Sequence, residues 1–286
     1  MFLMKAKKAV ILLNGPDLLR YQHSIADLLL QADYVFGFSY GALTNITFTD
    51  FIYEAPILDG INERALDPIE WLNSAINNCC FALASQIPIA LMNKKIDRVY
   101  LNSSNSSSFL KTLAPSNNWL NFIKPNYFFV NEATNYSTCQ SLRYYFNSSL
   151  FLSIPINYRC SCIRALSLAY LNGSEIIHIY GMSPSTPRYF LLDASIQLLM
   201  TNNSYWQDII SQWKLLEDQA VNQIHFEYYN SIFDKSMVYN IFLYIKLLIS
   251  YHQKVIGREL SIKVFSEDPL VLEAAASTGM QASLSR

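Results

Sequence analysis

An apolar run of strand length near the N-terminus, ending in a tight turn, constrains the fold more than any other feature. Residues Ala9–Leu13 are all apolar, and Asn14-Gly15-Pro16-Asp17 follows directly. A strand that is apolar on both faces is typical of the centre of a parallel sheet, because helices cover both faces there. Asp17 suits the cap of a helix that we expect over residues 18–31. The chain therefore begins with a predicted strand, turn and helix.

The same alternation of strand-like and helix-like segments continues along the chain. Further strands are predicted at residues 34–38, 46–53, 96–101, 127–130, 150–153, 175–180 and 261–265, and further helices at 66–92, 160–171, 189–251 and 269–277. Alternating strands and helices imply a mostly parallel sheet with right-handed crossovers. We therefore predict one α/β domain over residues 1–286, with a doubly wound sheet, helices on both faces and a candidate helical lid at 189–256.

Composition excludes several classes of protein. Of the 286 residues, 51% are apolar and 15% are charged, which provides for a buried core and argues against disorder. The net charge is −1, so the chain lacks the basic face typical of nucleic-acid binders. The five cysteines are odd in number and Cys79 and Cys80 are adjacent, so we expect buried free thiols rather than disulfides.

The apolar segments predict a soluble, cytoplasmic protein. The N-terminal run Ala9–Leu13 is too short for a signal peptide, and no small-residue cleavage site follows it. The nearest candidate for a membrane span, Met237–Tyr251, contains Asn240 and Lys246 and falls short of the roughly 20 apolar residues that cross a bilayer.

The loop Asn14-Gly15-Pro16-Asp17 is the first candidate site. In an open parallel sheet, ligands bind beyond the carboxyl ends of the strands, where the strand order reverses. Gly15 would let the backbone approach a ligand closely, and the next helix would present unpaired amides to an anion. Neither G-x-G-x-x-G nor G-x-x-x-x-G-K-[ST] occurs, so the dinucleotide and P-loop interpretations are weak. Taken alone, a plain turn is the stronger interpretation of this loop.

Arg159 and Ser161 form the second candidate site. They lie where the predicted helix 160–171 begins, and that helix leads into the strand 175–180 and Gly181. A guanidinium and a hydroxyl at a helix N-terminus suit a phosphate or a carboxylate, because the helix dipole favours an anion there. A capped amphipathic helix with an exposed arginine explains the same residues equally well.

Together, the two segments resemble the bacterial sialyltransferases of glycosyltransferase family 42. The similarity lies in the Asn-Gly-Pro loop after the first strand, and in Arg-x-Ser followed by a small-residue helix and Gly173-x-x-x-Ile177-x-x-x-Gly181. The pattern also resembles the related motility-associated, pterin-pyrophosphokinase-like proteins. The resemblance covers about residues 8–53 and 157–185, with the final strand and helix.

The resemblance implies a metal-independent transfer of sialic acid from its cytidine monophosphate (CMP) donor to the precursor of a bacterial surface glycan, with no other cofactor. It implies that the nucleotide contacts Asn14, Gly15, Pro16, Asp17, Ser39, Asp50, Arg159, Ser161, Cys162, Gly181, Met182 and Ser183. Ser39 and Asp50 would lie at the ends of the second and third strands. Gly181, Met182 and Ser183 would lie beside the base or the phosphate.

One of the four histidines is a candidate general base. His225 lies between the helices at about the distance after Gly181 that the resemblance implies. An ordinary structural role is the alternative for any single histidine. We expect His178 in the core, and His23 and His252 on the surface.

The chain differs from the family at two places. Ser39 and Asp50 stand where the family carries asparagine after the second and third strands. Ser183-Pro184-Ser185 stands where the family carries tyrosines that bind the leaving phosphate.

Two other functions stay open at this point. A pyrophosphoryl transferase of the pterin-pyrophosphokinase-like group would need magnesium and carboxylates, for which Asp17, Asp50 and Glu54 are the candidates. A non-catalytic protein with a degenerate nucleotide site would act through partners or through a helix at the inner face of the membrane. Four aromatic residues could form an acceptor lid or such a membrane-facing patch, with core packing as the alternative: Tyr228, Tyr229, Phe242 and Tyr244.

Overall fold

The computed structural model describes residues 6–53, 68–94, 96–101, 127–129, 161–185, 202–223 and 235–282. The described strands form one seven-stranded sheet in the order β5-β4-β3-β2-β1-β6-β7, and every neighbouring pair is parallel. They are β1 (Lys7–Leu12), β2 (Tyr34–Phe38), β3 (Asp50–Tyr53), β4 (Arg98–Leu101), β5 (Tyr127–Phe129), β6 (Ser174–Tyr180) and β7 (Ser261–Phe265). The predicted α/β class with a parallel sheet is confirmed. The strand predicted at 150–153 lies outside the described residues.

The strand order reverses at β1. Strands β2 to β5 are added on one side of β1, and β6 and β7 are added on the other. Val10 of β1 pairs with Val35 of β2 on one side and with His178 of β6 on the other. Such a reversal leaves a crevice beyond the carboxyl ends of the two central strands, because the connections depart to opposite faces. The fold therefore creates its switch point between β1 and β6.

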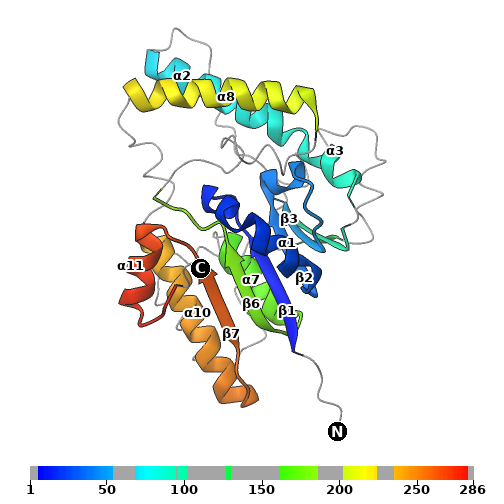
Figure 1. Cartoon of the computed structure of the whole chain (residues 1–286), viewed down its shortest axis with the longest axis vertical. Coiled ribbons are helices and arrows are strands. Elements are labelled where there is room, and N and C mark those ends of the chain that lie inside the picture. The colour runs from blue at the N-terminus through cyan, green and yellow to red at the C-terminus, as the bar shows by residue number, and fades with distance from the viewer. Residues whose placement is uncertain are drawn as a thin grey trace.

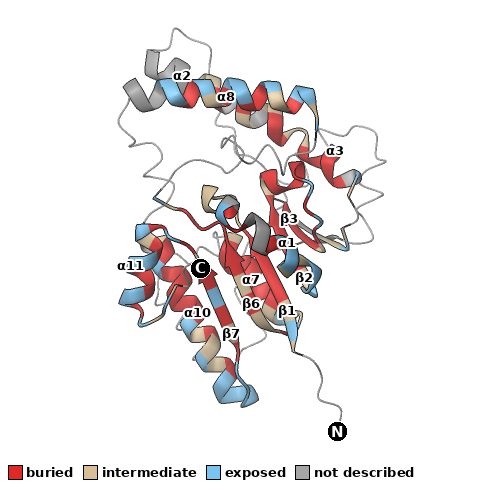
Figure 2. Ribbon diagram, in the orientation of Figure 1, coloured by how far each residue is buried: buried red, intermediate tan, exposed pale blue. Residues whose placement is uncertain are grey.

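Helices cover both faces of the sheet (Figure 1). They are η1 (Pro16–Tyr21), α1 (Gln22–Leu30), η2 (Ser39–Leu43), α2 (Pro68–Ala84), α3 (Ile87–Met92), α7 (Ser161–Leu171), α8 (Ser204–Gln223), α10 (Lys235–Ile256) and α11 (Pro269–Ser277). Neighbouring residues of a strand point to opposite faces, so Val10 joins the core with α1, α2, α3 and α8, while Ala9 and Ile11 join the core with α7, α10 and α11. Figure 2 shows both cores as buried residues between the sheet and its helices.

In the described part of the segment predicted as a helical lid, α8 and α10 have different places in the fold. Helix α10 is a core element, because Phe242, Tyr244, Ile245 and Leu248 are completely buried in the second core. That part of the lid prediction is wrong, as is a membrane-facing role for Phe242 and Tyr244. Helix α8 lies beside α2, on the side of the sheet to which the carboxyl ends point (Figure 1). A lid role for α8 stays a prediction.

The third strand begins later than predicted, at Asp50 rather than at residue 46. The preceding Phe48 folds its ring over β2, where a Cβ added to Gly37 would lie 2.4 Å from Cε1 of that ring. Thr49 meanwhile receives the amide of Val35 on its hydroxyl at 2.8 Å. Phe48 is thus buried because it packs over a glycine, not because it pairs in the strand, which a strand pattern does not reveal.

The helix predicted at 66–92 is broken into α2 and α3. Pro88 lies in the first turn of α3, where a proline is tolerated because its missing amide would be unpaired. Across this break, the 18-residue stretch Ser74–Leu91 has a mean hydropathy of 1.2 and half of it is buried inside the molecule. By length and composition it could cross a membrane, but a core helix passes the same test. It is the one such stretch in the described part of the chain.

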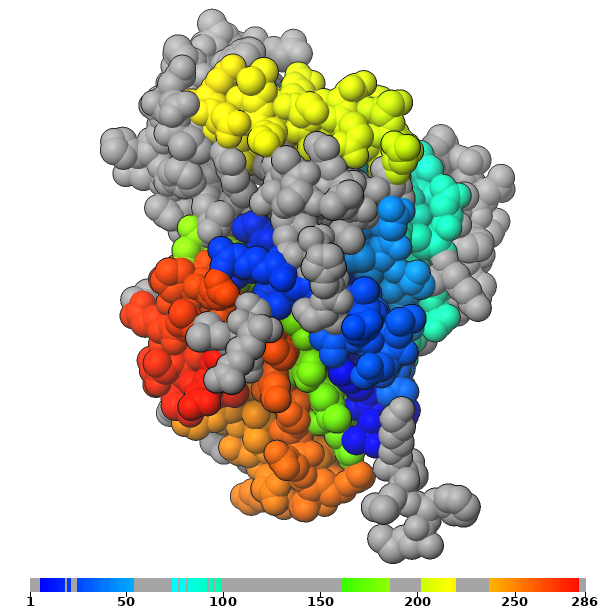
Figure 3. Space-filling view, in the orientation of Figure 1, coloured from blue at the N-terminus to red at the C-terminus, as the bar shows by residue number. Residues whose placement is uncertain are grey.

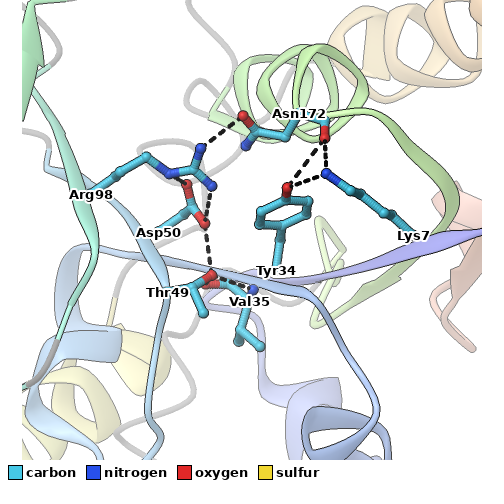
Figure 4. A network of polar contacts seen from close by, with 7 residues as sticks. All are labelled: Lys7, Tyr34, Val35, Thr49, Asp50, Arg98 and Asn172. Atoms are coloured by element: carbon cyan, nitrogen blue, oxygen red, sulfur yellow. Dashed lines mark hydrogen bonds and ion pairs between the residues drawn. The ribbon is translucent and has the colours of Figure 1, made fainter.

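Asp50 lies at the opposite edge of the sheet from the place that the family resemblance implies. It is the first residue of β3, so it stands at an amino end, where its buried carboxylate pairs with the Arg98 guanidinium at 2.8 and 3.0 Å. Arg98 also donates to the side chain of Asn172 at 2.9 Å, and Tyr34 and Lys7 donate to the Asn172 carbonyl (Figure 4). The predicted nucleotide contact of Asp50 is therefore wrong, because Asp50 is the first residue of β3 and the carboxyl end of this strand lies at Tyr53.

We expect Asp50→Ala to lower the free energy of unfolding by about 3 kcal/mol, because it leaves a largely buried guanidinium without its counter-ion. The matched control is Glu175→Ala, which removes the 2.7 Å ion pair to the exposed Arg258. This surface pair should contribute less than about 1 kcal/mol. Urea unfolding followed by circular dichroism measures both variants. Equal losses would contradict a special role for the buried pair.

Candidate functional site

The loops that follow β1 and β6 continue side by side beyond the ends of the two strands. The Leu13 amide donates to the Tyr180 carbonyl at 2.9 Å, and the Gly15 amide donates to the Gly181 carbonyl at 2.9 Å. The two loops that the sequence singled out, residues 14–17 and 181–183, are therefore direct neighbours at the switch point.

Two glycines make this approach possible. A Cβ on Gly15 would lie 2.4 Å from the Gly181 carbonyl oxygen and 2.8 Å from the Ser183 hydroxyl. A Cβ on Gly181 would lie 2.4 Å from the Leu13 carbonyl oxygen, and Gly181 also has a φ of 76°, which favours glycine. The space that Gly15 leaves open is thus filled by the neighbouring loop. This is a structural reason for the glycine, in addition to the ligand contact that the sequence predicts.

Polar contacts join these loops to a third one, which follows β7. The Asp17 amide donates to the Ser183 hydroxyl at 3.2 Å, and the Asp17 carboxylate accepts from the Ser266 hydroxyl at 3.0 Å. Asp17 was expected to cap a helix, but the chain first forms the 3₁₀ turn η1, and α1 starts only at Gln22. The cap prediction is wrong, because the carboxylate is held by a residue distant in sequence.

The loop after β2 approaches the site from the other side. Ser39 follows β2 directly and has a φ of 37°, a strained backbone conformation for a residue with a side chain. A Cβ on Gly41, in the same turn, would lie 4.0 Å from the side-chain oxygen of Asn14. Ser39 and Asn14 therefore belong to adjoining loops at the carboxyl edge, as the sequence predicts.

Helix α7 begins at the same edge, because it runs back along the sheet before β6. Ser161 is its first residue and is partly exposed. The side chains of Cys162 and Met182 are buried in the apolar core. The predicted contacts of these two residues with the nucleotide could therefore come only from their backbone atoms. Arg159 lies outside the described residues.

Two histidines, His178 and His252, lie in described parts of the fold, and His252 differs from its predicted position. His178 lies in β6 against Phe265, and burial together with Lys8 and Lys263 lowers the pKa of His178 to about 4, so it is neutral at pH 7. His252 was expected on the surface but is buried, with Nδ1 3.1 Å from the Tyr170 hydroxyl.

The other two histidines are His225, the candidate general base, and His23. His225 lies outside the described residues, so its role as general base stays a prediction. His23 lies in α1. Among the residues that the structure describes, no three His, Cys, Asp or Glu side chains gather to hold a metal ion.

The loop after β7 was missed from the sequence. Its Asp268 caps α11 by accepting the amides of Leu270 and Val271, with Pro269 at the first helical position. This acidic cap and proline follow directly on a predicted strand, so the signal was present in the sequence. It became part of the site only because β7 lies next to β6 in the sheet.

Comparisons with known proteins add little to this geometry. No family model matches the sequence, and no curated protein matches it. Among solved structures, the chain is similar to the sialyltransferase CST-II in complex with a trisaccharide acceptor and CMP. That match covers 90% of this chain and 80% of the other, with 12% identity and a TM-score of 0.32. A TM-score this low carries no argument, so fold and site rest on the geometry of this chain.

We expect Gly15→Ala to lower the free energy of unfolding by about 1–3 kcal/mol, because the new methyl group meets a backbone carbonyl that cannot move freely. Gly41→Ala is the matched control, since its Cβ would have its nearest neighbour at 3.4 Å. Thermal unfolding of both variants measures the difference. If Gly15→Ala proved as stable as Gly41→Ala, the close approach of the two loops would be wrong.

Proposed function

We propose that this protein is a glycosyltransferase-like enzyme that binds CMP-sialic acid and transfers the sugar to a glycan without a metal. The observation that carries the proposal is the meeting of residues 14–17 and 181–183 at the switch point of a parallel sheet. Open α/β sheets bind nucleotides at this place. The resemblance of the same two loops to family 42 narrows the nucleotide to CMP and the sugar to sialic acid.

The phosphate of the donor would bind where α7 begins. The helix dipole favours an anion there, and Ser161 and Arg159 would add a hydroxyl and a guanidinium. Asn14 and Ser39 would contact the nucleotide from the loops after β1 and β2.

The leaving phosphate needs stabilisation, because sialyl transfer passes through an oxocarbenium-like transition state. The family tyrosines are replaced by Ser183-Pro184-Ser185. Ser185 is not free to serve, since its amide and hydroxyl both donate to Asp268, at 2.8 and 2.5 Å. The task would therefore fall to Arg159 and to the Ser183 hydroxyl, which accepts the Asp17 amide and keeps its own proton to donate.

The acceptor side of the reaction follows from the same resemblance. His225 would act as general base and remove the proton of the acceptor hydroxyl. The acceptor would be the precursor of a bacterial surface glycan, in the cytoplasm at the inner face of the membrane.

The position of Asp50 weighs against the alternative of magnesium-dependent pyrophosphoryl transfer. Of the three carboxylates proposed to hold magnesium, Asp50 is buried in an ion pair at the amino edge of the sheet. Glu54 lies outside the described residues. Asp17 is the carboxylate that the structure places at the switch point.

A thermal-shift screen tests the proposal, with CMP, CDP, UDP, GDP and ATP, each with and without magnesium. We expect CMP to raise the Tm by several degrees without metal, since a ligand at about 100 times its Kd stabilises by about 2.7 kcal/mol. Incubation with CMP-sialic acid and a glycan acceptor should release CMP. A response confined to ATP with magnesium would favour the pyrophosphoryl transferase, and no response would favour a non-catalytic protein.

Arg159→Ala locates the phosphate in the same assay. We expect it to weaken CMP binding by tenfold or more, because it removes a charge-assisted contact. Arg258→Ala, at an exposed ion pair of the opposite edge, is the control and should bind CMP normally. Unchanged CMP binding by Arg159→Ala would contradict the position of the phosphate.

A further inference from the structure

The loop after β7 ties the two predicted site loops together. The Ser266 hydroxyl lies 2.7 Å from the Met182 carbonyl oxygen and 3.0 Å from Oδ2 of Asp17, and it accepts the Asp268 amide at 3.1 Å. Ser266 is completely buried. In Figure 3, the blue atoms of the η1 region lie against the orange and red atoms of β7 and α11. Three loops that are distant in sequence therefore share one buried hydroxyl.

This hydroxyl has one proton and two acceptors within reach. A serine hydroxyl donates one hydrogen bond at a time, so it satisfies either the Met182 carbonyl or the Asp17 carboxylate. The other acceptor is left with an open lone pair at each moment. This part of the site therefore carries more acceptors than donors, which favours a ligand group that donates.

Among the described carboxylates at this edge, Asp17 has an oxygen available to a ligand. The buried Asp268 accepts from the amide and hydroxyl of Ser185 and from the first amides of α11. Glu267 forms a surface ion pair with Arg20. Oδ2 of Asp17 is held by the shared serine hydroxyl, whereas its Oδ1 accepts no hydrogen bond from the described part of the chain. Asp17 is also partly exposed, so a ligand can reach it.

We propose that Asp17 is a specificity residue that accepts a hydrogen bond from the nucleoside part of the ligand, and that Ser266 positions it. The donor is a ribose hydroxyl or the exocyclic amine of the base. The inference rests on the proposed nucleotide site and adds an orientation to it. Because a carboxylate repels a phosphate, the nucleoside lies toward β7 and the phosphate lies toward the start of α7.

The test compares two proteins with ligands that each lack one donor group. Wild type and Asp17→Asn are titrated calorimetrically with CMP, 2′-deoxy-CMP, 3′-deoxy-CMP and UMP. Wild type should bind CMP about tenfold more tightly than the one analogue that lacks the recognised donor, since a hydrogen bond to a charged group is lost. In Asp17→Asn, this ratio should fall to about one, because the amide turns a donor toward the ligand. Glu267→Gln, which changes a neighbouring carboxylate, should keep the tenfold ratio.

Ser266→Ala tests the positioning role. Its affinity for CMP should fall toward its affinity for the same analogue, so the ratio between the two should fall well below ten. Ser266→Thr retains the hydroxyl and should restore the ratio, which a loss of packing alone would not do. Circular dichroism of each variant establishes that it is folded.

Each result decides between the claims. An undiminished ratio in Asp17→Asn overturns the specificity role while the proposed nucleotide site stands. A normal ratio in Ser266→Ala, with a lost one in Asp17→Asn, overturns the positioning role alone. Wild type that binds none of the four nucleotides overturns the proposed site, and this inference with it.

Discussion

The contact between two glycine loops at the switch point holds the rest of the arrangement in place. Gly15 and Gly181 face each other so closely that a side chain on either would meet backbone of the other loop. The amide of Gly15 uses that proximity to extend the pairing of β1 and β6 beyond the sheet. As a result, the loops after the two central strands run together and form one edge. The contacts of Asp17, Ser183 and Ser266 all depend on this approach.

The two edges of the sheet use charge differently. At the amino edge, the charges of Asp50 and Arg98 neutralise each other in a largely buried ion pair, and removing either partner would destabilise the fold. At the carboxyl edge, hydroxyls and a partly exposed carboxylate meet at the place where the strand order reverses. This difference between the two edges is expected of a parallel α/β protein, in which ligands bind beyond the carboxyl ends of the strands.

Much of the fold could be predicted, because most strands contain a short run rich in apolar residues, as the buried strands of a parallel sheet require. The first residues of some strands and the burial of some helix ends could not be predicted from the sequence. Asp50 was misplaced because Phe48 is buried by packing over Gly37 and not by pairing in β3, which begins at Asp50. His252 was misplaced because the helix end that carries it packs against Tyr170 of α7, a tertiary contact. Periodicity along one segment does not contain such information.

The candidate site was predictable in part for a related reason. The loops after β1 and β6 carry Gly15 and Gly181, which were visible in the sequence and which the close approach of the loops requires. No sequence pattern identifies Ser266, since its contacts with Asp17 and Met182 depend on the position of β7 beside β6. Sequence patterns identify the end of a strand, but the order of strands decides which ends meet.

Hydrogen exchange measured by mass spectrometry, with and without CMP, tests the location of the site most directly. CMP should slow exchange in peptides that contain residues 14–18 and 181–185, and should leave exchange at residues 172–174, on the amino edge, unchanged. Slower exchange at the amino edge, with no change at residues 14–18 and 181–185, would contradict a nucleotide site at the switch point.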